Sequence, residues 1–178
     1  MGTRRVVTGH SPAGKAVVAS DTIVDPVTTP FSPGRESYTL WGGDVAPRFP
    51  DDGSKPPFSM FFPPVGGFRF GLFVLPPDRT PVDLAGVDVD AAMQAYDAAM
   101  PGLASYMEPG SPGMHTTDTI DYEYVVSGRC ILELDDGVTV ELRPGDTVVQ
   151  NGTRHAWRNP FDEPCTLVLV LIGAQRAH

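Results

Sequence analysis

From residue 119 to residue 172 the chain alternates short β-prone segments with tight turns, and this pattern limits the folds open to it more than any other feature. The β-prone segments are 119–126, 129–134, 138–142, 147–150, 155–157 and 166–172. The turns at 135–137 and 143–146 contain glycines, which adopt backbone angles that other residues resist. Short strands joined by tight turns predict an antiparallel meander that closes into a barrel or sandwich.

The first half of the chain has the same strand-rich character and one predicted helix. Strands are predicted at 4–8 and 15–20, which form a hairpin, and at 37–41 and 67–75. Apolar residues recur at helical spacing from Val89 to Met100, Asp88 can cap this helix, and its Met and Tyr stripe predicts a packing face. We expect one domain over 1–178, with an N-terminal part (1–87), the helix (88–102) and a barrel half (110–174).

Charge and hydropathy argue against several classes of partner. Lys and Arg number 13 against 22 Asp and Glu, and the formal net charge is −9. Without a basic stripe, neither a nucleic acid nor an anionic membrane is expected as a partner. No apolar run approaches the roughly 20 residues of a membrane span, and the N-terminus lacks a signal sequence, so we expect a cytoplasmic protein. Cys130 and Cys165 are expected to be buried free thiols.

The loop 44–66 is rich in Pro and Gly yet carries Phe58, Met60, Phe61 and Phe62. A loop this apolar is expected to pack, either as a flap over a pocket or in a subunit contact. Together with Tyr122 and Tyr124, the apolar side chains of this loop present more apolar surface than a soluble monomer usually exposes. We therefore expect a homodimer formed by barrel faces and the N-terminal hairpin.

Four side chains able to bind metal or to move protons fall close together, and they are His115, Asp121, Glu123 and His155. Asp121 and Glu123 share one face of the predicted strand 119–126, while Tyr122 and Tyr124 share the other. Periodicity shows which residues lie together but not which face is buried. The acids face water if the aromatic face packs inward. They face the barrel interior if the aromatic face lies outside.

This region resembles the two sequence motifs of the cupin superfamily, over roughly the last 65 residues. The shared order is a histidine, an acid, a strand-ending Gly, Pro-Gly-Asp, and a second histidine followed four residues later by Asn. Here these residues are His115, Asp121, Gly128, Pro144, Gly145, Asp146, His155 and Asn159. The resemblance implies an all-β fold: an antiparallel jelly-roll barrel with an N-terminal strand-rich extension, one helix and a ligand cavity. It also favours the arrangement in which Asp121 faces inward.

The sequence departs from the cupin motifs at ligand positions. Thr117 stands where a second histidine is usual, and Asp121 replaces a longer Glu. Gln150 stands where the motif has Pro, and the interval from Gly145 to His155 is one residue shorter than usual. The four-ligand site therefore does not carry over, but His115, Asp121 and His155 retain a two-His, one-carboxylate set. Such a set suits Fe, Zn or Mn, and we expect the metal to be weakly bound or absent.

The sequence leaves three functions open. The first is a lyase or isomerase that dehydrates or decarboxylates an organic acid or an aromatic, polyketide-like metabolite. His155 would act as acid or base, oriented by Asp121, with Glu123 as a second acid. Trp157, Arg69 and Phe61 are the candidate substrate contacts, although a solvated Arg69 is the alternative. The second is a non-haem iron dioxygenase, and the third is a module that binds a small ligand without turnover.

Overall fold

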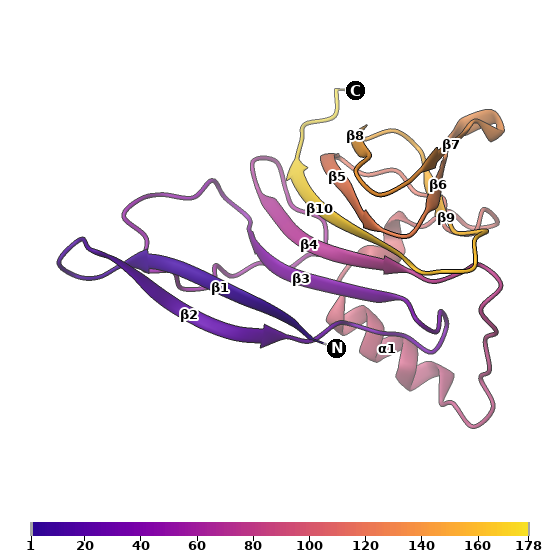
Figure 1. Cartoon of the computed structure of the whole chain (residues 1–178), viewed down its shortest axis with the longest axis horizontal. Coiled ribbons are helices and arrows are strands. Elements are labelled where there is room, and N and C mark those ends of the chain that lie inside the picture. The colour runs from indigo at the N-terminus through magenta and orange to yellow at the C-terminus, as the bar shows by residue number, and fades with distance from the viewer. Residues whose placement is uncertain (1, 178) are drawn as a thin grey trace.

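The computed structural model describes residues 2–177 and consists almost wholly of antiparallel strands (Figure 1). The elements in chain order are β1 (Thr3–His10), β2 (Ala16–Val24), β3 (Glu36–Gly43), β4 (Phe68–Leu75), α1 (Val89–Ala99), η1 (Leu103–Tyr106), β5 (Thr119–Ser127), β6 (Cys130–Glu133), η2 (Asp135–Gly137), β7 (Thr139–Leu142), β8 (Thr147–Asn151), β9 (Ala156–Arg158) and β10 (Cys165–Gly173). Every predicted strand is present, which confirms the all-β class. The two short 3₁₀ helices, η1 and η2, were not predicted.

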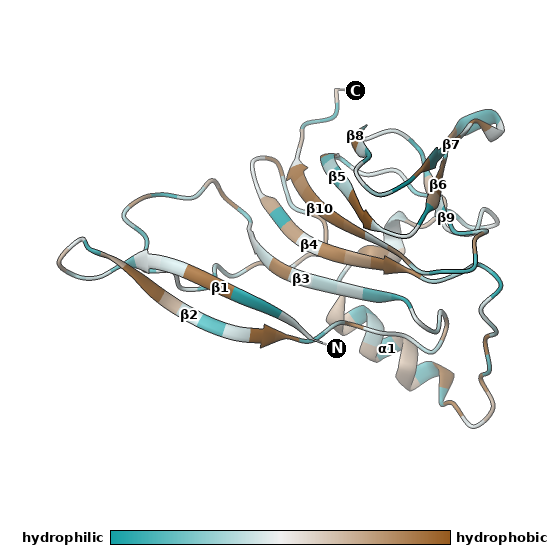
Figure 2. Ribbon diagram, viewed as in Figure 1, coloured by the Kyte–Doolittle hydropathy of each residue, from teal (hydrophilic) through white to brown (hydrophobic). Residues whose placement is uncertain are grey.

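The strands form two facing sheets and a separate hairpin. The larger sheet has the order β3-β4-β10-β5-β8, the smaller one has the order β7-β6-β9, and β1 pairs only with β2. Between the two sheets lies a buried apolar core made of Leu75, Val125, Cys130, Leu132, Leu142, Cys165 and Leu167. Figure 2 shows the apolar character of β10, the central strand of the larger sheet. This closed arrangement is the barrel that the sequence predicts.

Two residues of the predicted motif close the barrel at the end near this core. Gly128 has φ +70°, and a Cβ there would lie 2.1 Å from the carbonyl oxygen of Pro164, so only glycine fits. Asn159 is fully buried, and its amide nitrogen donates to the carbonyl oxygens of Leu75 at 3.0 Å and Glu163 at 2.8 Å. Asn159 therefore ties three chain segments together, which is a structural role.

The helix α1 lies on the surface and corrects one expectation. Asp88 caps it as predicted, since its carboxylate accepts a hydrogen bond from the backbone of Ala91 at 3.0 Å. None of the residues in α1 is buried, and Val89 and Met93 are 45% and 48% exposed. The predicted packing face is therefore wrong for these residues, because helical spacing shows that apolar side chains align but not that another layer covers them.

Both cysteines are buried free thiols within the core, as the sequence predicts. Among residues 2–177, no helix combines the length and the apolar character that a membrane crossing requires.

Candidate active site in the barrel interior

The acidic pair on β5 faces the barrel interior. Asp121 and Glu123 are 3% and 8% exposed, whereas Tyr122 and Tyr124 on the opposite face are each 46% exposed. The arrangement with inward acids is therefore confirmed. Asp121 Oδ1 and Glu123 Oε2 are buried without a hydrogen-bond partner. Buried polar atoms are normally paired, and unpaired ones in a native fold call for an explanation such as a bound ligand or a catalytic role.

Burial also sets the charge of this pair. Burial, and to a smaller extent the neighbouring Asp121, raise the pKa of Glu123 to about 8. Burial raises the pKa of Asp121 to about 6, opposed by a hydrogen bond from Thr119. At neutral pH, Glu123 therefore holds a proton while Asp121 is mostly ionised, and the pair contains one proton donor and one acceptor.

A pair of histidines forms the second part of the site. His115 and His155 exchange backbone hydrogen bonds of 2.9 and 3.0 Å, and their ring centroids are 4.2 Å apart. Each Nδ1 contacts a carbonyl oxygen, Gly113 for His115 at 3.0 Å and Thr153 for His155 at 2.9 Å. A carbonyl oxygen only accepts, so each Nδ1 carries the hydrogen and each neutral ring has a free lone pair on Nε2.

Both imidazoles are neutral at physiological pH. Burial, and to a smaller extent the adjacent His115, lower the pKa of His155 to about 4. Burial also lowers the pKa of His115. A neutral imidazole with a free Nε2 lone pair is able to accept a proton.

The contacts of His155 correct the expected role of Asp121. We expected Asp121 to orient His155, but the His155 ring is oriented by the Thr153 carbonyl instead. The acidic pair belongs to the larger sheet, whereas His155 directly precedes β9 of the smaller sheet. The two pairs thus belong to different layers of the barrel.

The donor set does not form a complete metal site. Within the described part of the chain, no three His, Cys, Asp or Glu side chains are grouped closely enough to hold a metal ion. The predicted set His115, Asp121 and His155 is therefore not assembled, and only the two imidazoles lie together. Iron and zinc sites in enzymes use at least three protein ligands, so these residues do not fit such a metal in this arrangement.

Aromatic side chains cover the histidine pair. Phe62, from the loop 44–66, is 8% exposed and packs edge-on against Tyr106 at 4.6 Å, with the His115 ring 6.5 Å away. Phe61 packs against Phe62 at 4.9 Å. Trp157 meets the His155 ring at 6.3 Å in a T-shaped contact. Phe62 and Trp157 are thus aromatic neighbours of the histidine pair, and Phe61 contacts Phe62.

Arg69 is buried and engaged with the protein itself. It is 3% exposed, so the alternative of a solvated Arg69 is wrong. Its guanidinium pairs with Asp44 at 2.6 Å and donates to the carbonyl oxygens of Met60, Gly43 and Phe68 at 2.8 to 3.3 Å. These contacts join the loop 44–66 to the sheet, so Arg69 anchors the loop that carries Phe61 and Phe62.

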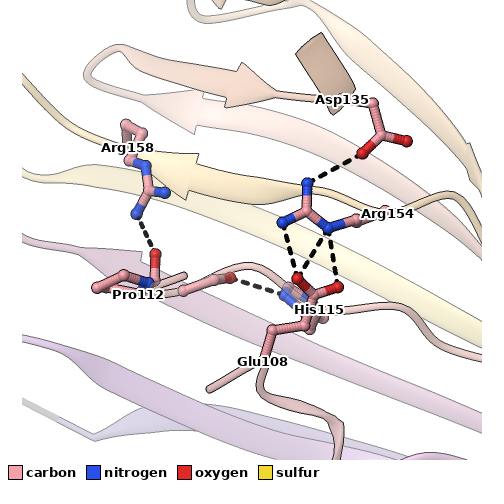
Figure 3. Close-up of polar contacts among 7 residues, drawn as sticks. Glu108, Pro112, His115, Asp135, Arg154 and Arg158 are labelled. Atoms are coloured by element: carbon pink, nitrogen blue, oxygen red, sulfur yellow. Dashed lines mark hydrogen bonds and ion pairs between the residues drawn. The ribbon is translucent and has the colours of Figure 1, made fainter. Parts of the chain in front are cut away.

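A network of ion pairs fixes the segments that carry the histidines (Figure 3). Arg154, adjacent to His155, binds both oxygens of Glu108 at 2.8 Å and Asp135 at 2.9 Å. Arg158 donates to the Pro112 carbonyl at 2.6 Å, close to His115. The backbone positions of the two histidines are therefore held from outside the barrel.

Two inward polar residues were missed by sequence reasoning. Thr119 is 3% exposed, and its hydroxyl lies 2.8 Å from that of Thr117 and bonds to Asp121. Gln150 is 3% exposed and pairs in register with Asp121 across β5 and β8. The sequence did contain a signal for Thr119. Positions 119, 121 and 123 share one face of the strand, so Thr119 faces inward together with the two acids.

Comparisons with known proteins agree with this fold. Residues 104–171 match the sequence model of the family described as "Cupin domain". The chain is 36% identical over 92 residues to "Phomopsin biosynthesis cluster protein D" of Diaporthe leptostromiformis, covering 45% of this chain and 48% of that protein. It is 43% identical over 84 residues to "Oryzines biosynthesis cluster protein J" of Aspergillus oryzae, covering 40% and 47%.

A third relative is the "Cupin-domain-containing oxidoreductase srdB" of Neurospora crassa, 30% identical over 115 residues, which cover 61% of this chain and 59% of that protein. The chain therefore spans about half the length of the curated relatives that it matches.

Proposed function

Because this chain belongs to the cupin superfamily, we propose that it is a small-molecule enzyme that catalyses dehydration, decarboxylation or isomerisation by acid/base chemistry. The observation that carries the proposal is the inward acidic pair, in which Asp121 and Glu123 each keep a buried oxygen without a partner. Unpaired buried oxygens are costly to folding, and a substrate that bonds to them would offset that cost.

Glu123 and His155 have different roles in the proposed proton transfer. Glu123, protonated at neutral pH, donates a proton to the departing hydroxyl or to a carbonyl oxygen of the substrate. His155, neutral and with a free Nε2, removes a proton from carbon. Burial and the neighbouring Asp121 keep Glu123 protonated, and the cover formed by Phe61 and Phe62 limits the access of water.

The substrate that this interior favours is an aromatic or polyketide-like metabolite rather than an organic acid. A substrate carboxylate would meet the ionised Asp121, and Arg69 is engaged with Asp44 and backbone carbonyls. Trp157 and Phe61 supply apolar surface for an aromatic ring. Relatives named for phomopsin and oryzine biosynthesis clusters support a role in building a metabolite.

The test measures turnover directly. The purified protein is incubated with a panel of aromatic β-hydroxy carbonyl compounds, with aryl carboxylates included as the disfavoured class, and loss of water or of carbon dioxide is followed by mass spectrometry. We expect turnover to fall by about 10²-fold or more in His155→Ala and in Glu123→Gln. Glu141→Gln, at an exposed acid on β7, serves as the matched control. Full activity in both site variants would refute the proposal.

A second candidate function is an oxidoreductase of the non-haem iron class, since one relative is named a cupin-domain-containing oxidoreductase. It would require His115, Asp121 and His155 to move into one ligand set, because they are not grouped in this structure. Metal analysis of protein purified without chelator separates the two candidates. Stoichiometric iron that is lost in His155→Ala would favour the oxidoreductase.

A further inference from the structure

Arg35 places a positive charge on the inner side of the larger sheet. It directly precedes β3 and is half-buried. Its guanidinium lies over the Phe73 ring, with the central carbon 5.0 Å from the ring centroid. Phe73, on β4, packs against the buried core between the two sheets. The guanidinium therefore lies at the β3 edge of the sheet, on the side that faces the barrel interior.

Most hydrogen-bond donors of this guanidinium are unused. Nε of Arg35 donates to Ser32 Oγ at 3.2 Å, but the two terminal nitrogens make no hydrogen bond to any residue from 2 to 177. Within the same part of the chain Arg35 forms no ion pair. Arg69, by contrast, is engaged with Asp44 and with three carbonyl oxygens. A half-buried cation without an anion is costly, and a bound anion would offset that cost.

The charge of Arg35 acts on groups of the candidate active site. Burial lowers the pKa of Arg35 itself, because its cation loses part of its hydration. Arg35 adds to the effect of burial in lowering the pKa of His115, and it opposes the rise that burial causes in the pKa of Tyr96 on α1. Asp78 favours the cation, but its Oδ1 accepts a hydrogen bond from the backbone of Asn159 at 3.0 Å. Charge effects decay with distance, so Arg35 belongs to the same region as His115.

The strand register sets the separation between Arg35 and the acidic pair. Across the inner face, Phe73 aligns with Val125 of β5 through β10. Glu123 lies two residues before Val125, and Asp121 lies four residues before it. At the usual strand spacing and rise, the Cα atoms of Phe73 and Glu123 are about 12 Å apart, and those of Phe73 and Asp121 are about 16 Å apart. An anion at Arg35 is thus remote from the ionised Asp121, whereas an extended aromatic molecule can reach both Arg35 and Glu123.

We propose that Arg35 binds an ionised oxygen of the substrate, a phenolate or an enolate, at the end of the molecule remote from Glu123. The bound group belongs to the aromatic or polyketide-like substrate of the proposed function, on which this assignment rests. Phenolates and enolates spread their charge into a conjugated system. They therefore lose less hydration than a carboxylate does when they bind a half-buried guanidinium beside aromatic rings. The contact orients the substrate, with its reacting end at Glu123 and His155.

The first test measures binding without turnover, by calorimetric titration. The probe is para-nitrophenol at a pH where it is ionised, and para-nitroanisole, which has no ionisable oxygen, is its neutral counterpart. We expect Arg35→Met to weaken para-nitrophenolate binding by about tenfold or more, as the loss of a charge-assisted hydrogen bond does, and to leave para-nitroanisole binding unchanged. Arg35→Lys keeps the charge without the planar fork and should lose less affinity. The unmodified protein should bind para-nitrobenzoate more weakly than para-nitrophenolate.

Arg143→Met is the matched control, since Arg143 is exposed and its loss changes the net charge by the same amount. Circular dichroism verifies that each variant is folded. Equal affinity of Arg35→Met and unmodified protein for para-nitrophenolate would overturn the proposal. An equal loss in Arg143→Met, or no binding to unmodified protein, would do the same. Tighter binding of para-nitrobenzoate would overturn the assignment to phenolates and enolates.

The second test separates this contact from the chemistry. In the turnover assay we expect Arg35→Met to raise KM by about tenfold or more for substrates with a phenolic hydroxyl, with a smaller change in kcat, and to leave their O-methyl ethers unaffected. Glu123→Gln should instead lower kcat. Turnover that depends on Glu123 but not on Arg35 would refute the contact alone. Binding that depends on Arg35, without turnover in any protein, would support the contact and count against the proposed chemistry.

Discussion

Glu123 is the residue whose surroundings differ most from those of an ordinary surface carboxyl. Its pKa is raised from 4.5 to about 8 by burial and by Asp121, so the folded state keeps a proton that the unfolded state has lost. Between these two pH values the folded state binds more protons than the unfolded state. The free energy of unfolding therefore falls as pH rises. Above about pH 8 this loss is complete.

We therefore expect Glu123→Gln to be more stable than the unmodified protein at pH 9, by on the order of 1–4 kcal/mol. Thermal unfolding between pH 7 and pH 9 measures this difference in stability. Asp121 and His155 titrate below this window and do not contribute to the change. Glu141→Gln, at a site that is 56% exposed, should follow the unmodified protein. Equal pH dependence in all three proteins would mean that Glu123 ionises normally.

The prediction about metal affinity depends on Thr117. Its side chain is 1% exposed at the position where the motif usually has a histidine. We expect metal to be substoichiometric in the unmodified protein after dialysis. Thr117→His, which adds an imidazole two residues after His115 at a buried position, should raise Zn²⁺ or Co²⁺ affinity by about tenfold or more. Affinity should fall as pH drops toward about 4, because protonated imidazoles do not bind metal and burial lowers the pKa of His155 to about 4.

Calorimetric titration with Zn²⁺ checks this expectation, and Thr117→Val provides a buried replacement without a ligand. Chelator-resistant occupancy in the unmodified protein would show that other side chains complete the site.

At the scale of elements, the buried guanidinium of Arg69 anchors the loop 44–66 to the sheet. Arg69→Met removes the ion pair with Asp44 and the hydrogen bonds to three carbonyls, and we expect it to cost about 2–4 kcal/mol. Hydrogen exchange in 44–66 should become faster, since the loop loses its anchor. Arg79→Met, which breaks an exposed ion pair with Asp162, should cost under about 1 kcal/mol. Unchanged exchange in Arg69→Met would show that the other contacts of the loop, such as the backbone hydrogen bonds of Asp51 and Phe61, hold it without this anchor.

At the scale of the whole molecule, the homodimer that the sequence leads us to expect would link folding to association. Subunits that are stabilised by each other unfold at a temperature that rises with protein concentration. We expect such a rise for the unmodified protein and none for Val149→Glu, which places a charge on an exposed position beside Tyr122. Calorimetry over a hundredfold range of concentration, of the order needed to resolve the shift, provides the measurement. An unfolding temperature that is independent of concentration in both proteins would contradict a folding-linked dimer.

The sequence by itself determined where the strands lie and which side chains share a strand face, because turn chemistry and the two-residue period are local properties. It therefore placed Asp121 and Glu123 together, and the cupin resemblance supplied the barrel. Only the tertiary structure decided which face of β5 is buried, that Arg69 anchors a loop, and that the His115 ring packs against the His155 ring. These facts depend on contacts between segments far apart in the chain, for which local periodicity carries no signal. The same reason explains why α1, apolar at helical spacing, lies uncovered on the surface.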